Sequence, residues 1–332
     1  DLAGTWHYNT YPGAGCDVPS VFYSYSFFLN PNWSRVYSLH DEIKQYFRDC
    51  AQQLGLYDHI RFGTEVTCAD YQESDGQWQL SLGDGSQLQA RVLVSGLGQL
   101  NVPSTPHFEG AETFKGDRFH SARWNHEVDL KGKKVAIIGN AASALQFIPH
   151  VAEVAEQVTV YQRSANYVVP RNDRPYTEAE KSRFARFPWW QRLHRLSVFI
   201  RGEIMYGAIA NKRFFKWLLA RQARQYLEEQ VQDPELRATL TPDYPIGCKR
   251  ILVSDNYYQA IIRSNVRVVT SPISAIGESG IQTNDGESLD ADVIIYGTGF
   301  ETTKLLAPVD FRGRDGVSLQ EAETSHPRLG PL

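Results

Sequence analysis

Residues 133–149 read KKVAIIGNAASALQFIP and join an apolar strand, a glycine and a helix. The apolar run at 135–138 is typical of a strand buried in a parallel sheet, and Gly139 follows it directly. This order predicts a turn that places the pyrophosphate of a dinucleotide on the first amides of a helix. The fingerprint is incomplete, because alanines stand where the second and third glycines are expected. We expect cofactor contacts from this turn and the helix after it: Gly139, Asn140, Ala141, Ala142, Ser143, Ala144 and Gln146.

The next strand indicates which dinucleotide is bound. Residues 157–162 (QVTVYQ) have the apolar pattern of the second strand of a βαβ unit, and Arg163 follows 24 residues after Gly139. An acidic residue at this place accepts a hydrogen bond from the ribose of NAD, whereas an arginine suits the 2′-phosphate of NADP. Ser164 adds a hydroxyl group beside it. The alternative interpretation of Arg163 is a solvated surface charge.

Two segments of the chain resemble each other. Residues 84–98 read DGSQLQARVLVSGLG and residues 285–299 read DGESLDADVIIYGTG, with seven of fifteen aligned positions identical. In each segment an Asp-Gly turn opens a strand, and the strand ends in Gly-x-Gly, where another group approaches the backbone closely. We predict buried parallel strands at 92–94 and 293–295, each preceded by a β-meander. We favour a duplicated nucleotide-binding architecture over two hairpins that are similar by chance.

Composition excludes several classes of protein. The chain has 332 residues, of which 42% are hydrophobic and 22% charged, which is ordinary for a globular protein of about two domains. Its 34 basic and 38 acidic side chains give a net charge of −4, so no nucleic-acid partner is expected. No apolar run is long enough to span a membrane, and residues 1–20 lack the pattern of a signal peptide. The four cysteines are far apart, which argues against a disulfide framework or a metal site and suits the reducing cytoplasm.

A motif just before the nucleotide turn resembles a family fingerprint. Residues 114–124 (FKGDRFHSARW) match F-x-G-x-x-x-H-x-x-x-W through Phe114, Gly116, His120 and Trp124. The segment resembles the fingerprint of Baeyer–Villiger monooxygenases, which belong to the class B flavoprotein monooxygenases. The following residue is usually Pro or Asp in that family and is Asn here, while the tryptophan favours this branch over N- and S-oxygenating relatives. We interpret His120 and Trp124 as a structural and conformational element near the hinge between the nucleotide domains.

The resemblance implies a fold, cofactors and a reaction. The fold would be α/β, with two Rossmann-like dinucleotide-binding domains and a helical insertion. The enzyme would use NADPH and FAD to insert one oxygen atom of O2 into a ketone, or another small oxygenatable substrate, and a ketone would give an ester or lactone. The alternatives are an N- or S-oxygenating monooxygenase and a truncated, non-catalytic remnant.

The resemblance also carries candidate site residues. Arg250 would be the fixed cation that stabilises negative charge during oxygen transfer, and Asp17 would hold its guanidinium group. Lys249 would supplement Arg163 at the phosphate of NADP. Without the resemblance, Lys249 and Arg250 are a solvated pair in a loop, and Asp17 is an Asx turn before Pro19. Further cofactor contacts are implied for Thr5, Trp6, Asp17, Tyr23, Val66, Arg250 and Gly299.

Matching the family along the chain predicts the domain organisation. We expect the first glycine turn to precede Asp1, which leaves the FAD domain incomplete, and we expect the chain to be truncated at its other end as well. The tail at 323–332 has no counterpart in the family. The expected division is a partial FAD domain at 1–103, an NADP domain at 104–174 and 241–288 with a helical insertion at 175–240, and a return to the FAD domain at 289–332.

The remaining pattern places helices and meander strands. Residues 187–222 interleave aromatic and aliphatic residues with basic ones, which predicts two or three amphipathic helices. They either pack over the substrate cleft or make weak peripheral contact with a membrane surface. Another helix is expected at 38–55, with Ser38 as its cap and Gly55 as its stop. Meander strands are expected at 77–82 and 280–283.

Overall fold

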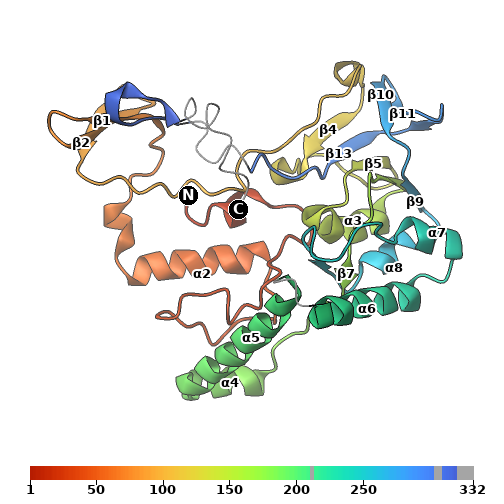
Figure 1. The fold of residues 1–332 in the computed structure, drawn as a ribbon, viewed down its shortest axis with the longest axis horizontal. Coiled ribbons are helices and arrows are strands. Elements are labelled where there is room, and N and C mark those ends of the chain that lie inside the picture. The colour runs from red at the N-terminus through yellow and green to blue at the C-terminus, as the bar shows by residue number, and fades with distance from the viewer. Residues whose placement is uncertain (210–212, 303–308, 320–332) are drawn as a thin grey trace.

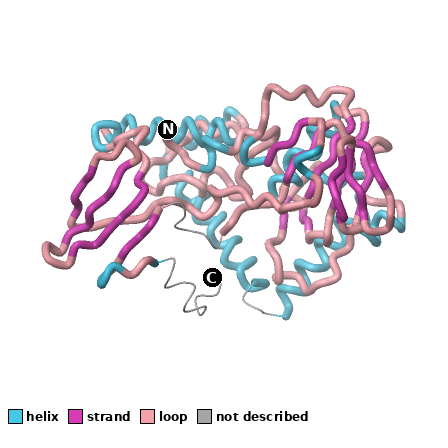
Figure 2. The backbone as a smooth tube through the Cα atoms, turned by 90° about the horizontal axis from the view of Figure 1, so that it is seen from above, coloured by secondary structure: helices cyan, strands magenta, loops and turns pink. Residues whose placement is uncertain are grey.

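The structure is a computed structural model that describes residues 1–209, 213–302 and 309–319. Figure 1 shows a small sheet and a large sheet at opposite ends of the molecule, with α2 and the loops near the N-terminus on the side of the small sheet. Figure 2 shows the same two groups of strands from above. The α/β class predicted from the sequence is confirmed.

The large sheet of the described residues contains five parallel strands, and a hydrophobic cluster covers each of its faces, as such a sheet requires. In register, Ile138 lies opposite both Tyr296 and Tyr161, so three strands end at the same level. The predicted βαβ unit is present, because β5 is followed by α3 and then β6. The strand order is β4 (Asp117–His120), β13 (Val293–Tyr296), β5 (Lys134–Ile138), β6 (Gln157–Tyr161) and β9 (Val266–Val269).

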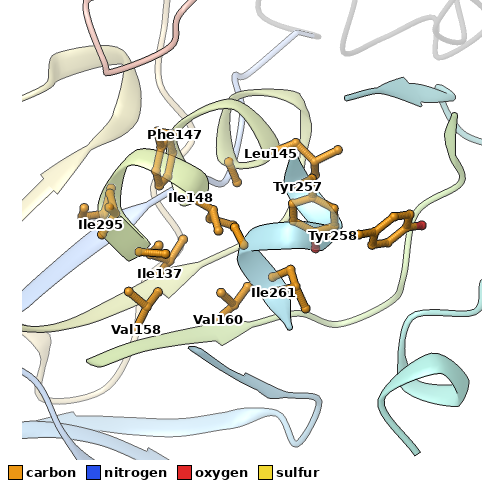
Figure 3. Packing of buried hydrophobic residues seen from close by; sticks show 14 of the residues in the cluster. Ile137, Leu145, Phe147, Ile148, Val158, Val160, Tyr257, Tyr258, Ile261 and Ile295 are labelled. Carbon is orange, nitrogen blue, oxygen red and sulfur yellow. The ribbon is translucent and has the colours of Figure 1, made fainter. Parts of the chain in front are cut away.

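A hydrophobic core joins this sheet to the helices on one face. Helices α3 (Ala142–Val154) and α8 (Tyr257–Ile261) lie against side chains of the central strands (Figure 3). Burial of these aliphatic groups removes apolar area from water and is the main force that holds the unit together. The side chains labelled in Figure 3 are Ile137, Leu145, Phe147, Ile148, Val158, Val160, Tyr257, Tyr258, Ile261 and Ile295.

Two meanders follow the repeat predicted from the sequence. In each, an Asp-Gly turn joins the last two strands, and Leu80 and Leu82, expected on one face of β2, are both buried. The first meander gains a fourth strand, β14, which pairs in parallel with β1. The strands are β1 (Val66–Gln72), β2 (Gln77–Leu82), β3 (Gln87–Ala90) and β14 (Asp310–Arg312) in one sheet, β10 (Ile273–Gly277), β11 (Gly280–Thr283) and β12 (Ser288–Asp290) in another, and β7 (Val168–Val169) with β8 (Leu252–Val253) in a third.

The prediction of a buried strand at 92–94 is wrong. Residues 92–98 form no strand, and the side chains of Val92 and Val94 are 75% and 85% exposed. The described residues place no strand beside this segment, so its backbone groups have no ladder to join. The equivalent segment of the second copy is β13, which lies between β4 and β5 and is fully buried.

The placement of β13 also bears on the domain division. The sequence assigns residues 289–332 to the return to the FAD domain, whereas β13 is a central strand of the same sheet as β5 and β6. The chain leaves this sheet only after Tyr296. Two segments then run side by side between the halves: the amide of Ser104 donates to the carbonyl of Gly299, and that of Glu301 donates to the carbonyl of Val102.

Helices lie within 178–209 and 213–239, in the range 175–240 that the sequence assigns to an insertion, and Figure 1 shows α4, α5 and α6 along one edge. The predicted cap of α2 is wrong. That helix begins at His40, and the hydroxyl group of Ser38 instead bonds that of Ser20 at 2.8 Å. Gly55 ends the helix in a left-handed conformation, as expected. The α-helices are α1 (Thr5–Tyr8), α2 (His40–Gln53), α4 (Glu178–Arg186), α5 (Pro188–Ile209), α6 (Arg213–Gln230) and α7 (Pro234–Thr239), besides α3 and α8.

Short 3-10 helices complete the described structure, at Leu56–His59, Ala111–Thr113, Ser121–Arg123 and Arg314–Gly316. Among the described helices, none is long and apolar enough to cross a membrane. The tail at 323–332 lies outside the described residues.

Candidate functional site

A cavity of about 610 Å³ opens where β5, β6 and β13 end. In open parallel sheets, ligands bind outside the carboxyl ends of the strands, beside the turns that lead into helices. Residues from the nucleotide turn, the end of β6 and the crossing segments all line it. They include Ser104, Gly139, Asn140, Ala141, Arg163, Ser164, Asn166, Lys249, Gly297 and Thr298.

The nucleotide turn depends on close backbone packing. Gly139 has φ +103°, and a Cβ atom there would lie 2.5 Å from the carbonyl oxygen of Gly297. Only glycine adopts this conformation in this space without displacing the neighbouring strand end. The side chain of Asn140 donates to Gln162 Oε1 and to the carbonyl of Ser164, both at 2.9 Å. The turn after β5 is therefore tied to the end of β6.

Cationic groups gather at the mouth of this cavity. Lys249 Nζ donates to Ser164 Oγ at 2.7 Å and lies 4.4 Å from the centre of the Tyr244 ring. Arg163 lines the same cavity and is exposed. The structure thus brings together Arg163, Ser164 and Lys249, although Lys249 is far from the other two in the sequence. Two cations and a hydroxyl group form a suitable site for a phosphate group.

Asp17 and Arg250 form a second cluster. Arg250 Nη2 lies 3.4 Å from Asp17 Oδ2, and the side chain of Arg250 is 67% exposed while that of Asp17 is 15% exposed. Gln146 of α3 donates to Asp17 Oδ1 at 3.2 Å and to the carbonyl of Gly15 at 3.0 Å. Its amide oxygen accepts from the hydroxyl group of Tyr11 at 2.9 Å. The helix after the nucleotide turn therefore fixes the segment that carries Asp17.

Burial raises the pKa of the Asp17 carboxyl group, while Arg250, Arg171 and the Gln146 amide act in the opposite direction. Sequence reasoning missed Arg171. Its guanidinium group donates to the carbonyl of Cys16 at 2.7 Å and lies over the ring of Tyr37. The available signal was its place shortly after the apolar pair of β7, since polar residues at strand ends of α/β proteins often face a ligand.

A third group of predicted residues lines a separate cavity of about 520 Å³, whose mainly apolar walls include the rings of Trp6, Tyr23, Tyr25, Phe27 and Phe47. Trp6 Nε1 donates to the hydroxyl group of Tyr23 at 3.0 Å, and Thr5 stands beside Trp6 at the start of α1. The two cavities share no lining residue among those described. The predicted site residues therefore fall into three clusters.

Other predicted residues lie outside these clusters. Val66 begins β1 and packs against the core of the small sheet. Gly299 stands in the segment that crosses between the halves, with φ +80°. In the first turn of α3, the hydroxyl group of Ser143 lies 3.3 Å from that of Ser121, and Ala144 is buried beside Ala142. Their cofactor contacts stay predictions.

The fingerprint residues surround β4. A Cβ atom on Gly116 would lie 2.1 Å from the carbonyl oxygen of Asp292, so this position requires glycine. Phe114 is buried against the other face of the sheet, and the ring of Trp124 packs on Phe147 of α3 at 5.3 Å. His120 ends β4, and its ring lies 6.0 Å from that of Phe300 in the crossing segment.

Burial lowers the pKa of His120, so its imidazole is neutral near pH 7. Its Nδ1 accepts a hydrogen bond from the amide of Ala122 at 3.0 Å. A neutral histidine held by the backbone at a strand end is suited to fixing the chain, and its structural role stays a prediction.

Residues 20–305 match the model of the flavin-binding monooxygenase-like family. The chain belongs to that family. It is 39% identical over 328 residues to a Baeyer–Villiger monooxygenase of Pseudomonas aeruginosa, which covers 98% of this chain and 62% of the relative. A Baeyer–Villiger monooxygenase of Streptomyces coelicolor is also 39% identical, over 96% of this chain. The chain thus spans less than two thirds of the length of these curated relatives.

Solved structures of family members have the same fold as this chain. A steroid monooxygenase bound to NADP superimposes with a TM-score of 0.86 at 34% identity, over 99% of this chain and 71% of that one. An open structure of cyclohexanone monooxygenase gives a TM-score of 0.84 at 28% identity, over 97% of this chain and 71% of that one. The predicted family is therefore confirmed.

Proposed function

We propose that the protein of which this chain is part is an NADPH- and FAD-dependent monooxygenase that inserts oxygen into a ketone to give an ester or lactone. The observation that carries the proposal is the Arg250–Asp17 pair, held beside the nucleotide unit by Gln146. Relatives named Baeyer–Villiger monooxygenase support it.

The residues at the large cavity fit NADP. Its pyrophosphate would meet the turn at Gly139, where a Cβ atom has no room and the amides of α3 begin. The 2′-phosphate would be held by Arg163, Ser164 and Lys249. NAD has no such phosphate, so these three groups favour NADP over NAD. Bound NADPH supplies the hydride for reduction.

The residues at the second cavity fit one part of FAD. Its aromatic walls, with Thr5, Trp6 and Tyr23, suit a flat ring. Residues 1–65 form no strand followed by a glycine turn and a helix, so these residues give no site of that kind for the pyrophosphate of FAD. Flavin contacts are therefore proposed for the ring only, where bound FAD would supply oxygen chemistry.

Arg250 is the group we assign to stabilising negative charge at the reacting atoms. A guanidinium group keeps its proton at all accessible pH values, so it remains a cation beside an anionic oxygen. Asp17 limits its motion through the ion pair, and Gln146 limits the motion of Asp17. Loss of a comparable charge-stabilising donor costs roughly 10²–10³ in rate.

The test is product analysis of the full-length protein with NADPH, O2 and a cyclic ketone or a sulfide. We expect the lactone from the ketone, and we expect Arg250→Ala to bind cofactors normally but lower lactone formation by roughly 10²–10³. Arg250→Lys keeps the charge but not the geometry of the guanidinium group. Its rate of lactone formation should lie between those of the wild type and Arg250→Ala. Wild-type rates in Arg250→Ala would contradict the assignment, and sulfoxide without lactone would contradict the proposed substrate class.

A further inference from the structure

Helix α5 carries an apolar stripe that the rest of the described chain leaves open. Its residues follow one another at intervals of four, three, four and four, which places them on one face of a helix. The opposite face is anchored, because Gln191 and Val198 are buried. The stripe consists of Trp189, Leu193, Leu196, Ile200 and Ile204, each 49–55% exposed.

Contacts of Arg195 fix this orientation. Its Nη1 donates to the carbonyl groups of Val21, Phe22 and Ser24 at 2.9–3.0 Å, so α5 cannot turn its stripe inward without losing three bonds to a charged group. The stripe is therefore a fixed part of the surface.

The start of α6 continues the apolar surface. Phe214, Trp217 and Leu218 are 45–64% exposed, while Leu219 and Ala223 on the other side of the helix are buried. One turn later the outward positions become polar, with Arg221 and Arg224. We call these three residues and the five on α5 the α5–α6 stripe. Figure 1 shows the two helices at one edge of the molecule.

The charge around the stripe is strongly positive. Apart from Arg195, which binds the N-terminal loop, the described residues of α5 and of α6 up to position 222 contain five Arg and Lys residues and one acidic residue, Glu203, whereas the whole chain has a net charge of −4. A second copy of the chain would bring the same positive charge to the same face, which disfavours self-association. A flat surface with an apolar interior and anionic head groups matches both the apolar and the basic residues.

We propose that the α5–α6 stripe rests on a membrane surface that contains anionic lipids. Tryptophan side chains favour the boundary between head groups and acyl chains, and arginine side chains reach the phosphates from positions beside an apolar stripe. The surface lies outside the three clusters of predicted site residues and is independent of the proposed activity.

The experiment is co-sedimentation of the full-length protein with vesicles of phosphatidylcholine alone or with phosphatidylglycerol added. We expect binding to the anionic vesicles that weakens as salt is raised. Leu193→Gln with Ile200→Gln should abolish it, while the control Ile262→Gln, equally exposed just after α8, should not. Arg192→Gln with Arg201→Gln should weaken binding roughly fivefold for each charge, and Lys131→Gln with Lys133→Gln should have no such effect.

Three results would overturn the proposal. Absence of binding to anionic vesicles would mean that another part of the protein covers the stripe. Equal binding to both kinds of vesicle would show that the basic border has no role. A change of oligomeric state in the Leu193→Gln and Ile200→Gln variant without vesicles would identify the stripe as an interface between copies.

Discussion

The two copies of the repeat share seven of fifteen residues, but only part of each copy has the same structure. In both, the Asp-Gly turn closes an antiparallel hairpin, at Asp84 in the first copy and at Asp285 in the second. Beyond the hairpin they diverge. Residues 293–296 form the buried strand β13, whereas residues 92–95 are irregular, with Val92 and Val94 exposed and only Leu93 packed against the core of the small sheet.

The difference teaches that a strand of this kind is made by its neighbours. β13 has β4 on one side and β5 on the other, and both provide hydrogen bonds and apolar contacts. The first copy has an equally apolar Val-Leu-Val run but no partner strand within the described residues. Turns are local and follow from sequence, while a central parallel strand requires contacts distant in the chain.

The largest expected effect comes from equivalent apolar positions of the two copies. Ile295→Ala should lower the free energy of unfolding of this chain by about 2–5 kcal/mol, because it leaves a cavity in the core. Val94→Ala at the matching position should change it by less than about 0.5 kcal/mol, since that side chain is already in water. Urea denaturation of both variants measures this, and equal losses would mean that the two segments are equally buried.

A smaller effect is expected at the first glycine of each Gly-x-Gly. A Cβ atom on Gly297 would lie 3.1 Å from Cβ of Ala144 at the start of α3, whereas Gly96 has no atom within 4 Å. Gly297→Ala should cost about 1–3 kcal/mol and also weaken NADP+ binding, because it presses on the nucleotide turn. Gly96→Ala should do neither. Calorimetric titration of the two variants with NADP+ provides the comparison, and similar affinities would contradict it.

A third effect concerns α3, which packs against the sheet that contains β13. Through Gln146 this helix also holds the N-terminal segment that carries Gly15 and Asp17. Gln146→Leu removes the hydrogen bonds to Gly15 and Asp17 and should cost about 1 kcal/mol. The pKa of Asp17, already raised by burial, should rise further, because the amide favours the charged carboxylate. Titration of 13C-labelled aspartate by NMR tests this, with Gln225→Leu on the exposed side of α6 as control. If the pKa of Asp17 is unchanged in Gln146→Leu, Gln146 does not stabilise the Asp17 carboxylate.

The smallest expected effect concerns the turns, where the two copies should behave alike. Hydrogen bonds from Ser86 lower the pKa of Asp84, and a bond from Thr283 lowers that of Asp285. A lowered pKa stabilises the fold above the pKa of the unfolded chain, about 4, and this stability is lost as the pH falls. Asp84→Asn and Asp285→Asn should each reduce the dependence of stability on pH below about 4. A clear difference between them would show that the turns are not equivalent.

The parts of the molecule that could be predicted from sequence are those with local causes. The order of β5, turn, α3 and β6 follows from a short apolar run, one glycine and helical periodicity, and Arg163 has a fixed place after β6. The meander turns follow from Asp-Gly. These signals need no knowledge of distant residues.

Other features could not be predicted because distant segments create them. Arg171 reaches the segment of Asp17 only through the docking of two loops, and Gln146 meets Gly15 across more than a hundred residues. Ser38 stands at a suitable position to cap α2, but its hydroxyl group pairs with that of Ser20 instead of with an amide of the helix. The missing strand at 92–94 also could not be foreseen. A strand there requires a neighbouring strand, and the local sequence pattern does not show whether one is present.

The central claim is that the strand ends around β13 form a dinucleotide site in which Arg163 gives the preference for NADP over NAD. Calorimetric titration of the purified protein with NADP+ and NAD+ tests it most directly. We predict that NADP+ binds at least about tenfold more tightly, because charge-assisted bonds to its 2′-phosphate are worth roughly 1.5–3 kcal/mol. Arg163→Ala should remove most of this preference and leave the affinity for NAD+ unchanged. Equal affinity of the wild type for both dinucleotides, or an equal loss for both in the variant, would contradict the claim.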